Sequence, residues 1–400
     1  MENDFVLIGV DGGATKTTAC LIEYQATEGK FHLTTVADSL PYHEQEGYRS
    51  DFQPVDLQTQ LDEKDQTISL TSSERTQGNV IIAANARVIQ SVLRSRADKP
   101  VLIGIGFPGL KTSDGRGISA MANGPRMPQF LTILEDILRD KGVRFTAPIA
   151  RLGSDADYCG LGEEFGVRGQ FSDVDQVYYL GGGTGAADAL KLQGKLVPFD
   201  HTKTWLAKTW ELMNTKGVSM ERYASAGGIQ WVYSTYANIP LEDVQHRKIY
   251  PSQILSEAHN GSPAAIDTFH DVATNLAMLL FERMTTVYCG WKDLLEFVNP
   301  NREALNAQHP FTGTLLERIV IGQRLGELLK QSKDTGLFWD ELERNLTDLV
   351  TQFPDLDSTF VNYYCPQGRF NMNLISISPL REAPALGAAI DAFQHWRSTP

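Results

Sequence analysis

The stretch Val10-Asp11-Gly12-Gly13-Ala14-Thr15-Lys16-Thr17 decides the fold. It joins two apolar runs, residues 5–10 and 19–22, that are both predicted to be β-strands. A glycine-rich turn between strands exposes backbone N–H groups and hydroxyls, so it is suited to binding an anion. The Asp11 carboxylate at the same turn suits a hydrated Mg²⁺ ion beside phosphates.

A second turn of the same kind lies about 170 residues further on. It is Leu180-Gly181-Gly182-Gly183-Thr184-Gly185-Ala186, and it also joins two predicted strands. One such turn alone also fits a plain hairpin. Neither turn matches the P-loop pattern or the dinucleotide pattern G-x-G-x-x-G, which opens a helix. Two of them predict a duplicated phosphate clamp, and hence a protein that holds ATP between two related halves.

Length and composition describe an ordinary globular protein. The chain has 400 residues, 42% of them hydrophobic, which predicts two domains. The net charge of −13 argues against a nucleic-acid partner and against an anionic membrane surface. We also expect no signal peptide and no membrane span, because the N-terminus enters a strand directly and no apolar run approaches 18 residues. The four cysteines are scattered, so a cytoplasmic protein without disulfides is expected.

The order of the predicted elements defines the fold class. Three antiparallel strands open the chain, and strands then alternate with helices, which predicts an α/β fold with a mixed sheet. An irregular polar excursion is expected at residues 38–78 and a helix at 205–214. Loop-rich insertions are expected in three further stretches, which are residues 238–262, 291–312 and 332–372.

Two further segments have both a structural and a chemical interpretation. Ser154-Asp155-Ala156-Asp157 lies at a predicted strand-to-helix junction, where such residues cap helices. In the chemical interpretation Asp155 is a general base at the carboxyl end of a strand. Asn123, in an Asn-Gly-Pro sequence, is either a turn residue or a ligand for sugar hydroxyls, because its amide both donates and accepts. The eight histidines show no metal-binding pairing.

These motifs together resemble the ROK family of bacterial sugar kinases, in the actin-like ATPase superfamily. The Lys-Thr after the first turn is also similar to BadF-type ATPases and N-acetylglucosamine kinases. The similar segments follow one another from residue 5 to residue 393. They are DGGATKT (11–17), GFPG (106–109), ANGP (122–125), SDADYCGLGEE (154–164), LGGGTGAADALKLQGKL (180–196), GVSMERYASAGGI (217–229), IVIGQRLGELL (319–329) and PALGAAIDAF (384–393).

The resemblance implies a two-lobed actin-like (ribonuclease H-like) fold with mixed five-stranded sheets flanked by helices. The first lobe would span residues 1–125, with the helix 385–400 packed back on it, and the second lobe residues 126–384. Asp155 aligns with the catalytic base, and Asn123, Gly109 and Asp155 would bind the sugar. Asp11 would hold Mg²⁺. The ATP-binding residues would be Asp11, Gly12, Gly13, Thr15, Lys16, Thr17, Gly182, Gly183, Thr184, Gly185, Gly322 and Gln323.

The chain also departs from the family pattern. ROK proteins commonly carry a cysteine-rich zinc motif, but residues 213–217 contain no cysteine, so no structural zinc is expected. Pro198-Phe199-Asp200-His201 replaces the family's sugar-binding G-E-x-G-H segment, which leaves the identity of the sugar open. The adenosine-side Gly-Gly-Gly is reduced to Gly322-Gln323-Arg324. Relatives are often homodimers, but no interface pattern is legible here.

The leading hypothesis is an ATP-dependent kinase that phosphorylates a hydroxyl of a hexose or amino-sugar. Polyphosphate remains open as an alternative donor. A degenerate kinase that senses a sugar is the second hypothesis, motivated by the altered segment after Leu196. A third hypothesis is a BadF-like ATPase that acts on a partner protein, but such proteins usually bind an iron–sulfur cluster, and the scattered cysteines disfavour it.

Overall fold

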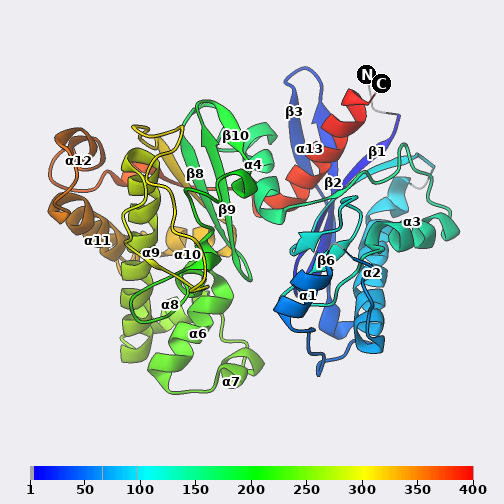
Figure 1. Cartoon of the computed structure of the whole chain (residues 1–400), viewed down its shortest axis with the longest axis horizontal. Helices are drawn as coiled ribbons and strands as arrows, with labels where there is room; N and C mark the ends of the chain where they lie inside the picture. The colour runs from blue at the N-terminus through cyan, green and yellow to red at the C-terminus, as the bar shows by residue number, and fades with distance from the viewer. Residues whose placement is uncertain (1–3, 65, 97, 400) are drawn as a thin grey trace. The chain divides into compact units, whose positions relative to one another are not determined.

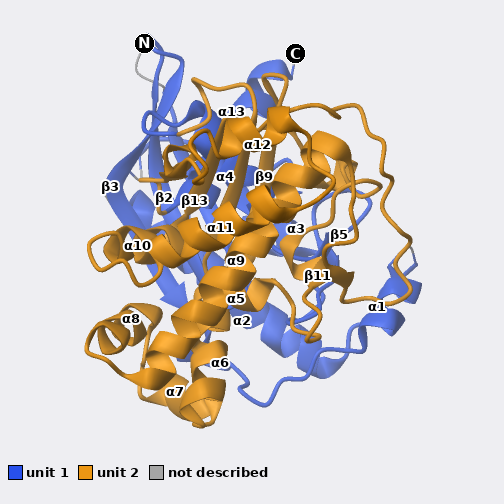
Figure 2. Ribbon diagram, turned by 90° about the vertical axis from the view of Figure 1, so that its left-hand side faces the viewer, with its two compact units in different colours: residues 1–169, 382–400 blue, residues 170–381 orange. Residues whose placement is uncertain are grey.

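The computed structural model describes residues 4–64, 66–96 and 98–399. The chain forms two compact units, coloured separately in Figure 2. Unit 1 comprises residues 1–169 and 382–400, and unit 2 comprises residues 170–381. Unit 1 therefore extends beyond the expected boundary at residue 125, because the chain after that residue adds one strand and two helices to this unit before it leaves.

Unit 1 is built on a mixed five-stranded sheet (Figure 1). Its order is β3-β2-β1-β4-β7, in which β1, β2 and β3 are antiparallel neighbours and β1, β4 and β7 are parallel. The bounds are β1 (Val6–Gly12), β2 (Lys16–Gln25), β3 (Lys30–Pro41), β4 (Val101–Gly106) and β7 (Leu152–Gly153). A separate small hairpin pairs β5 (Leu110–Lys111) with β6 (Ile118–Ala120).

Unit 2 repeats this topology. Its sheet has the order β10-β9-β8-β13-β14, again with three antiparallel strands followed by parallel ones. The bounds are β8 (Val177–Gly182), β9 (Ala186–Leu192), β10 (Lys195–Val197), β13 (Arg318–Gly322) and β14 (Ile375–Ile377). A small additional pair joins β11 (Leu212–Met213) and β12 (Glu296–Phe297). The predicted fold class and the predicted duplication are both confirmed.

The helices of unit 1 are α1 (Leu57–Glu63), α2 (Ser72–Leu93), α3 (Phe130–Asp140), α4 (Asp155–Phe165) and α13 (Ala383–Ser398). Helices α2 and α13 pack on the five-stranded sheet, α3 packs against α2, α4 packs against α13, and α1 lies against β6. Helix α13 approaches the sheet closely because two strand positions lack a side chain. A Cβ atom at Gly9 would lie 1.7 Å from the Ala385 carbonyl oxygen, and one at Gly104 would lie 1.8 Å from that of Ala388. The C-terminal helix therefore belongs to unit 1.

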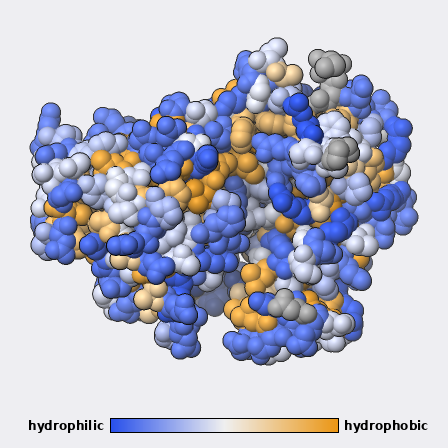
Figure 3. Space-filling model, turned by 45° about the horizontal axis from the view of Figure 1, so that its top comes forward, coloured by the Kyte–Doolittle hydropathy of each residue, from blue (hydrophilic) through white to orange (hydrophobic). Residues whose placement is uncertain are grey.

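Unit 2 is richer in helices. They are α5 (Glu221–Ala224), α6 (Ala226–Ala237), α7 (Leu241–His246), α8 (Pro251–His259), α9 (Pro263–Cys289), α10 (Gln323–Ser332), α11 (Trp339–Gln352) and α12 (Ser358–Tyr364). Helix α9 packs against α6, α8 and α11. The apolar side chains of each unit gather in a core of its own. The face drawn in Figure 3 is accordingly mostly hydrophilic with scattered apolar residues.

Several local predictions were wrong. The expected irregular excursion at 38–78 contains the end of β3, all of α1 and the start of α2. The expected loops at 238–262 and 332–372 contain α7, α8, α11 and α12. The helix expected at 205–214 is replaced by the short 3₁₀ turn Thr209–Glu211 and β11. Within the described ranges, no helix combines the length and the apolar character that crossing a membrane requires.

Candidate active site

The first glycine-rich turn lies where β1 ends and β2 begins. A Cβ atom at Gly12 would lie 2.3 Å from the Phe107 ring, so only glycine fits there. The Thr15 carbonyl accepts a hydrogen bond of 3.0 Å from the backbone N–H of Tyr42, which follows β3. Ala14 and Thr15 at the tip are exposed. The turn is thus held from one side and open at its tip, as a phosphate-binding turn requires.

A buried hydrogen bond between Thr17 and Asn85 supports this turn from the interior of unit 1. Thr17 is fully buried, and its hydroxyl donates a hydrogen bond of 2.8 Å to the side-chain oxygen of Asn85 in α2. The Asn85 amide donates in turn to the Ile81 carbonyl at 2.9 Å. The Thr17 hydroxyl is therefore engaged inside unit 1, and its predicted contact with phosphate stays a prediction.

Carboxylates converge at the carboxyl ends of the parallel strands of unit 1. In the strand register Asp11 lies opposite Gly106, and Gly106 lies opposite Gly153. The chain then turns into α4, whose first residue is Asp155. A Cβ atom at Gly106 would lie 3.5 Å from the Asp155 Cα atom, so the start of α4 lies against this row. Two residues that sequence reasoning selected 144 positions apart are therefore neighbours.

This arrangement changes the chemistry of Asp11. Burial raises the pKa of the Asp11 carboxyl to about 7, and the charge of Asp155 acts in the same direction. Glu382, just before α13, raises this pKa further, whereas Lys16 lowers it. An excess of negative charge at this edge favours a bound cation. Among the residues that the structure describes, no three His, Cys, Asp or Glu side chains form a direct metal cage.

The side chain of Asp155 is not the cap of α4. Ser154 is the N-cap, and its hydroxyl accepts a hydrogen bond from the Asp157 N–H at 3.3 Å. The helix is further fixed by Tyr158, whose hydroxyl donates to Asp391 of α13 at 2.8 Å. The capping role in the Ser-Asp-Ala-Asp sequence thus belongs to Ser154, and the general-base role of Asp155 stays a prediction.

Gly109 and Asn123, which are predicted to bind the sugar, lie on neighbouring segments of unit 1. Gly109 has a positive φ of 90°, and a Cβ atom there would lie 2.6 Å from the Ala120 carbonyl oxygen. Only glycine fits this close approach. Asn123 lies three residues beyond Ala120 with its side chain exposed. Gly109 therefore allows the backbone to approach closely, and Asn123 exposes an amide that can donate and accept hydrogen bonds.

The second turn and the predicted adenosine-side residues come together in unit 2. The Gly183 N–H donates to the Gly185 carbonyl at 2.9 Å, which closes the turn, and Thr184 at its tip is exposed. Gly182 forms a parallel bridge with Gln323 at the start of α10. Gln323 has a positive φ of 56°, which is strained for a residue with a side chain. Backbone strain of this kind is concentrated at ligand-binding sites.

Glu221, the first residue of α5, contacts this turn, and the sequence assigned it no role. Its carboxylate accepts a hydrogen bond of 3.0 Å from the Ala186 N–H, and a Cβ atom at Gly185 would lie 2.7 Å from its Oε1 atom. Helix α6 begins beside the same turn, because the Ala226 N–H donates to the Gly183 carbonyl at 3.0 Å. The signal for Glu221 was its place in the GVSMERYASAGGI segment.

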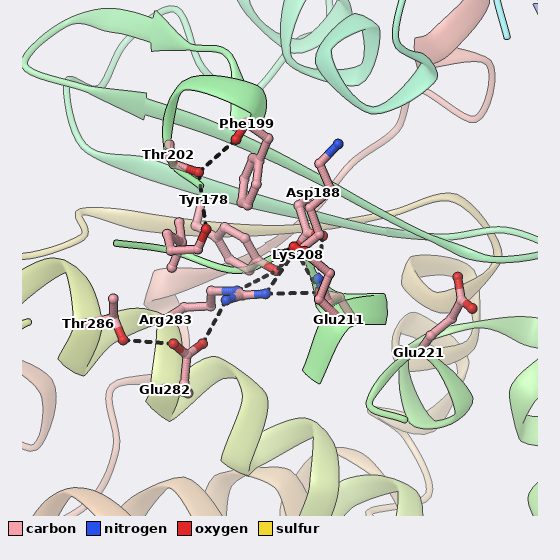
Figure 4. Close-up of polar contacts among 12 residues, drawn as sticks. Tyr178, Asp188, Phe199, Thr202, Lys208, Glu211, Glu221, Glu282, Arg283 and Thr286 are labelled. Atoms are coloured by element: carbon pink, nitrogen blue, oxygen red, sulfur yellow. Dashed lines mark hydrogen bonds and ion pairs between the residues drawn. The ribbon is translucent and has the colours of Figure 1, made fainter. Parts of the chain in front are cut away.

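A buried charged network stabilises the strand that leaves the second turn (Figure 4). Asp188 of β9 accepts hydrogen bonds of 2.6 Å from the hydroxyls of Tyr178 and Thr209. Arg283 of α9 pairs with Asp188 at 3.4 Å and with Glu282 at 2.7 Å. Burial raises the pKa of Glu282, although Arg283 opposes this shift. The network ties β9 and the 3₁₀ turn at Thr209 to the long helix.

Comparison of the structure with solved structures identifies the fold. A ROK family glucokinase from Streptomyces griseus, solved with glucose and AMPPNP, is similar with a TM-score of 0.56 and 15% identity, over 97% of this chain and 99% of that chain. The ROK hexokinase from Thermus thermophilus has a TM-score of 0.52 and 16% identity, over 98% and 99% of the two chains.

A ROK family transcriptional regulator, a homologue of the E. coli MLC protein, is also similar. Its TM-score is 0.53 and its identity 14%, over 98% of this chain and 78% of that chain. No family model and no curated protein sequence matches the chain. At these identities the likeness establishes the two-lobed actin-like fold of ROK proteins. Because one fold carries both kinases and a regulator, the activity has to be argued from the site.

Proposed function

We propose that this protein is an ATP-dependent kinase that phosphorylates a hydroxyl group of a hexose or amino-sugar. The observation that carries the proposal is the convergence of Asp11 and Asp155 at one edge of the sheet of unit 1. A pure sensor has no need for a second carboxylate at the start of α4, whereas a kinase needs a base for its acceptor.

Asp155 acts as the base in this proposal. Its carboxylate accepts the proton of the acceptor hydroxyl while the acceptor oxygen forms a bond to the γ-phosphorus of ATP. The bond between that phosphorus and the β–γ bridging oxygen breaks, and ADP leaves with the electron pair. Asn123 binds sugar hydroxyls through its exposed amide, and Gly109 lets the adjoining backbone approach.

The two glycine-rich turns bind the phosphates. In unit 1 the binding groups are the backbone N–H groups of Gly12 and Gly13, the exposed Thr15 and the Lys16 ammonium. In unit 2 the second turn supplies the phosphate-binding groups, which belong to Gly182, Gly183, Thr184 and Gly185. Gly322 and Gln323 bind on the adenosine side. Thr17 contributes through its bond to Asn85, which keeps the first turn in place.

Asp11 is the residue that fits a Mg²⁺ ion. The neighbouring Asp155 and Glu382 make this edge strongly acidic, and acidic oxygen ligands suit this ion. Bound Mg²⁺ supplies charge neutralisation on the phosphate oxygens. The role of Asp11 is to hold that ion through its water shell, which leaves the Asp155 carboxylate free to accept a proton.

A sugar-sensing protein is the second candidate. Two observations favour it: the similarity to a ROK regulator and the altered segment after Leu196. That segment folds as the 3₁₀ turn Phe199–His201, and Asp200 in it pairs with Lys203 at 3.1 Å and with Lys208 at 3.2 Å. We rank the kinase first because Asp11 and Asp155 are both present at one edge of the sheet of unit 1.

The test is a coupled ADP assay over a panel of hexoses and N-acetylhexosamines, repeated with polyphosphate as donor. Sugar-stimulated ADP production is expected for the wild type, and Asp155→Asn is expected to lower turnover by at least ~10²-fold with both ligands still bound. Asp157→Asn, two residues away in the same helix turn, is the matched control. Near-normal turnover of Asp155→Asn removes that residue from its role, and sugar-induced stabilisation without ADP production in the wild type supports the sensor.

A further inference from the structure

The loop Met121–Arg126, here called the Asn123 loop, has an unusual pattern of exposure. Ala122 and Asn123 at its tip are exposed, whereas Met121 and Gly124–Arg126 are buried. A backbone bridge between Ile118 and Met127, with hydrogen bonds of 2.9 and 3.0 Å, closes the loop at its base. The loop therefore presents one hydrogen-bonding side chain from an otherwise buried segment.

Gln60 of α1 holds the first end of the Asn123 loop. The Gln60 side chain is 1% exposed. Its oxygen accepts from the Met121 N–H at 2.8 Å, and its amide donates to the Met121 carbonyl at 3.2 Å. The same amide donates to the Val55 carbonyl at 2.7 Å, so the side chain joins the loop to the chain that enters α1. This two-way pairing fixes both backbone groups of Met121.

Arg126 holds the other end of the loop. Its guanidinium is 2% exposed and binds the Glu74 carboxylate in two-pronged fashion, at 2.7 Å through Nε and 3.0 Å through Nη2. It also pairs with Glu63, the last residue of α1. Glu74 in addition accepts a hydrogen bond of 2.9 Å from the Thr71 N–H and so completes the capping box that starts α2. Such planar, two-pronged pairs fix direction as well as distance.

Both ends of the loop are thus fixed by side chains between residues 55 and 74 that belong to α1 and to the start of α2. A hydrogen bond weakens steeply when its angle or distance changes, so an amide that selects sugar hydroxyls must be placed accurately. Because a separate segment places the tip of the loop, substitutions in that segment can change the position of the tip without any change in the catalytic base or the phosphate turns.

We propose that Gln60, Glu63 and Glu74 are positioning residues that act through the Asn123 loop, and that residues 55–74 thereby determine which sugars the enzyme accepts. This inference rests on the proposed kinase function. The positioning residues touch the loop backbone and Arg126, not the sugar, so their effect must pass through Asn123.

A double-mutant cycle tests this dependence. Gln60→Leu is expected to raise the KM for the sugar at least ~10-fold and to leave the KM for ATP within about twofold. In the Asn123→Ala background the same substitution is expected to change the sugar KM less than about twofold, because the side chain that the loop positions is already gone. Glu63→Gln, which weakens the pair with Arg126 at a half-exposed position, is expected to raise the sugar KM by a smaller factor and serves if Gln60→Leu fails to fold.

Two further measurements separate positioning from simple destabilisation. Val88→Ala, a core substitution in α2 away from the loop, is the matched control: it lowers the melting temperature and leaves the sugar KM unchanged. Hydrogen exchange of the ligand-free protein is expected to be at least ~10-fold faster at residues 122–124 in Gln60→Leu than in the wild type.

The outcomes are distinguishable. Additive effects in the cycle, an equal rise in both KM values, or unchanged exchange at 122–124 overturns the positioning role while the kinase function stands. A wild type that neither turns over nor binds any sugar overturns the proposed function, and the positioning role falls with it. A sugar-specific, non-additive KM change together with faster exchange supports both.

Discussion

Replacing Asp11 with Asn is expected to stabilise the protein while it removes activity. The Asp11 pKa rises from 3.8 to about 7 on folding, because burial and the charges of Asp155 and Glu382 disfavour its ionised form. At about 1.4 kcal/mol for each pH unit between these two values, the ionised carboxylate destabilises the folded state by up to about 4 kcal/mol. Because the neighbouring acidic side chains adjust when Asp11 is replaced, we expect the free energy of unfolding of the variant to rise by only about 1–3 kcal/mol.

The sign of the pH dependence follows from the same shift. Below pH 3.8 the carboxyl is protonated in both states and contributes no pH dependence. Between pH 3.8 and about 7 the unfolded chain binds fewer protons than the folded chain, so wild-type stability falls as the pH rises. Above pH 7 the destabilisation is complete. The advantage of Asp11→Asn is therefore expected to be small at pH 4 and largest at pH 8.

The assay is urea unfolding of the nucleotide-free protein at pH 4, 6 and 8. Asp140→Asn, which replaces an exposed carboxylate of unit 1, is the control for a general effect of charge removal. The coupled ADP assay measures the accompanying loss of turnover. An Asp11→Asn variant that is no more stable than the wild type at pH 8, or whose advantage is the same at pH 4 and pH 8, contradicts the reasoning.

Two further predictions follow from single contacts. Glu221→Gln retains an acceptor for the Ala186 N–H but weakens this hydrogen bond. The KM for ATP should therefore rise several-fold while the KM for the sugar stays unchanged. Equal changes in both KM values would argue against a role of Glu221 at the second turn. Burial alone would raise the pKa of Glu74, but hydrogen bonds from Arg126 and Thr71 hold it below its ordinary value of 4.5. Glu74→Gln should therefore lower the free energy of unfolding by about 2 kcal/mol at pH 7, and the deficit should shrink as the pH falls below 4.5; a deficit that stays constant in urea unfolding down to pH 3 would refute the pair's contribution.

Local sequence patterns predicted those elements whose structure depends on residues close together in the chain. Both glycine-rich turns, their flanking strands and the helix after Ser154 lie where the sequence predicts them, because turn residues and apolar alternation act over a few positions. The capping box of Thr71 and Glu74 was also legible, and it would have placed the start of α2 correctly.

Tertiary contacts overruled propensity elsewhere. Residues 205–214 have helical spacing, but the backbone N–H and the hydroxyl of Thr209 bind the buried Asp188 carboxylate instead. A buried carboxylate needs several donors, and that requirement outweighs a weak helical preference. Gln60 and Arg126 gave no sequence signal, since their partners lie 52 to 63 positions away or are backbone groups.

The sequence by itself determined the repeated turn and the α/β class, because both rest on short-range spacing, and it supplied the candidate residues through its motifs and their resemblance to a known family. Only the tertiary structure decided which of these residues meet. Parallel pairing of β1, β4 and β7 aligns Asp11, Gly106 and Gly153 across three strands and so brings Asp155 beside Asp11. The register between strands that lie far apart in the chain depends on which faces of the strands become buried when sheet and helices pack together.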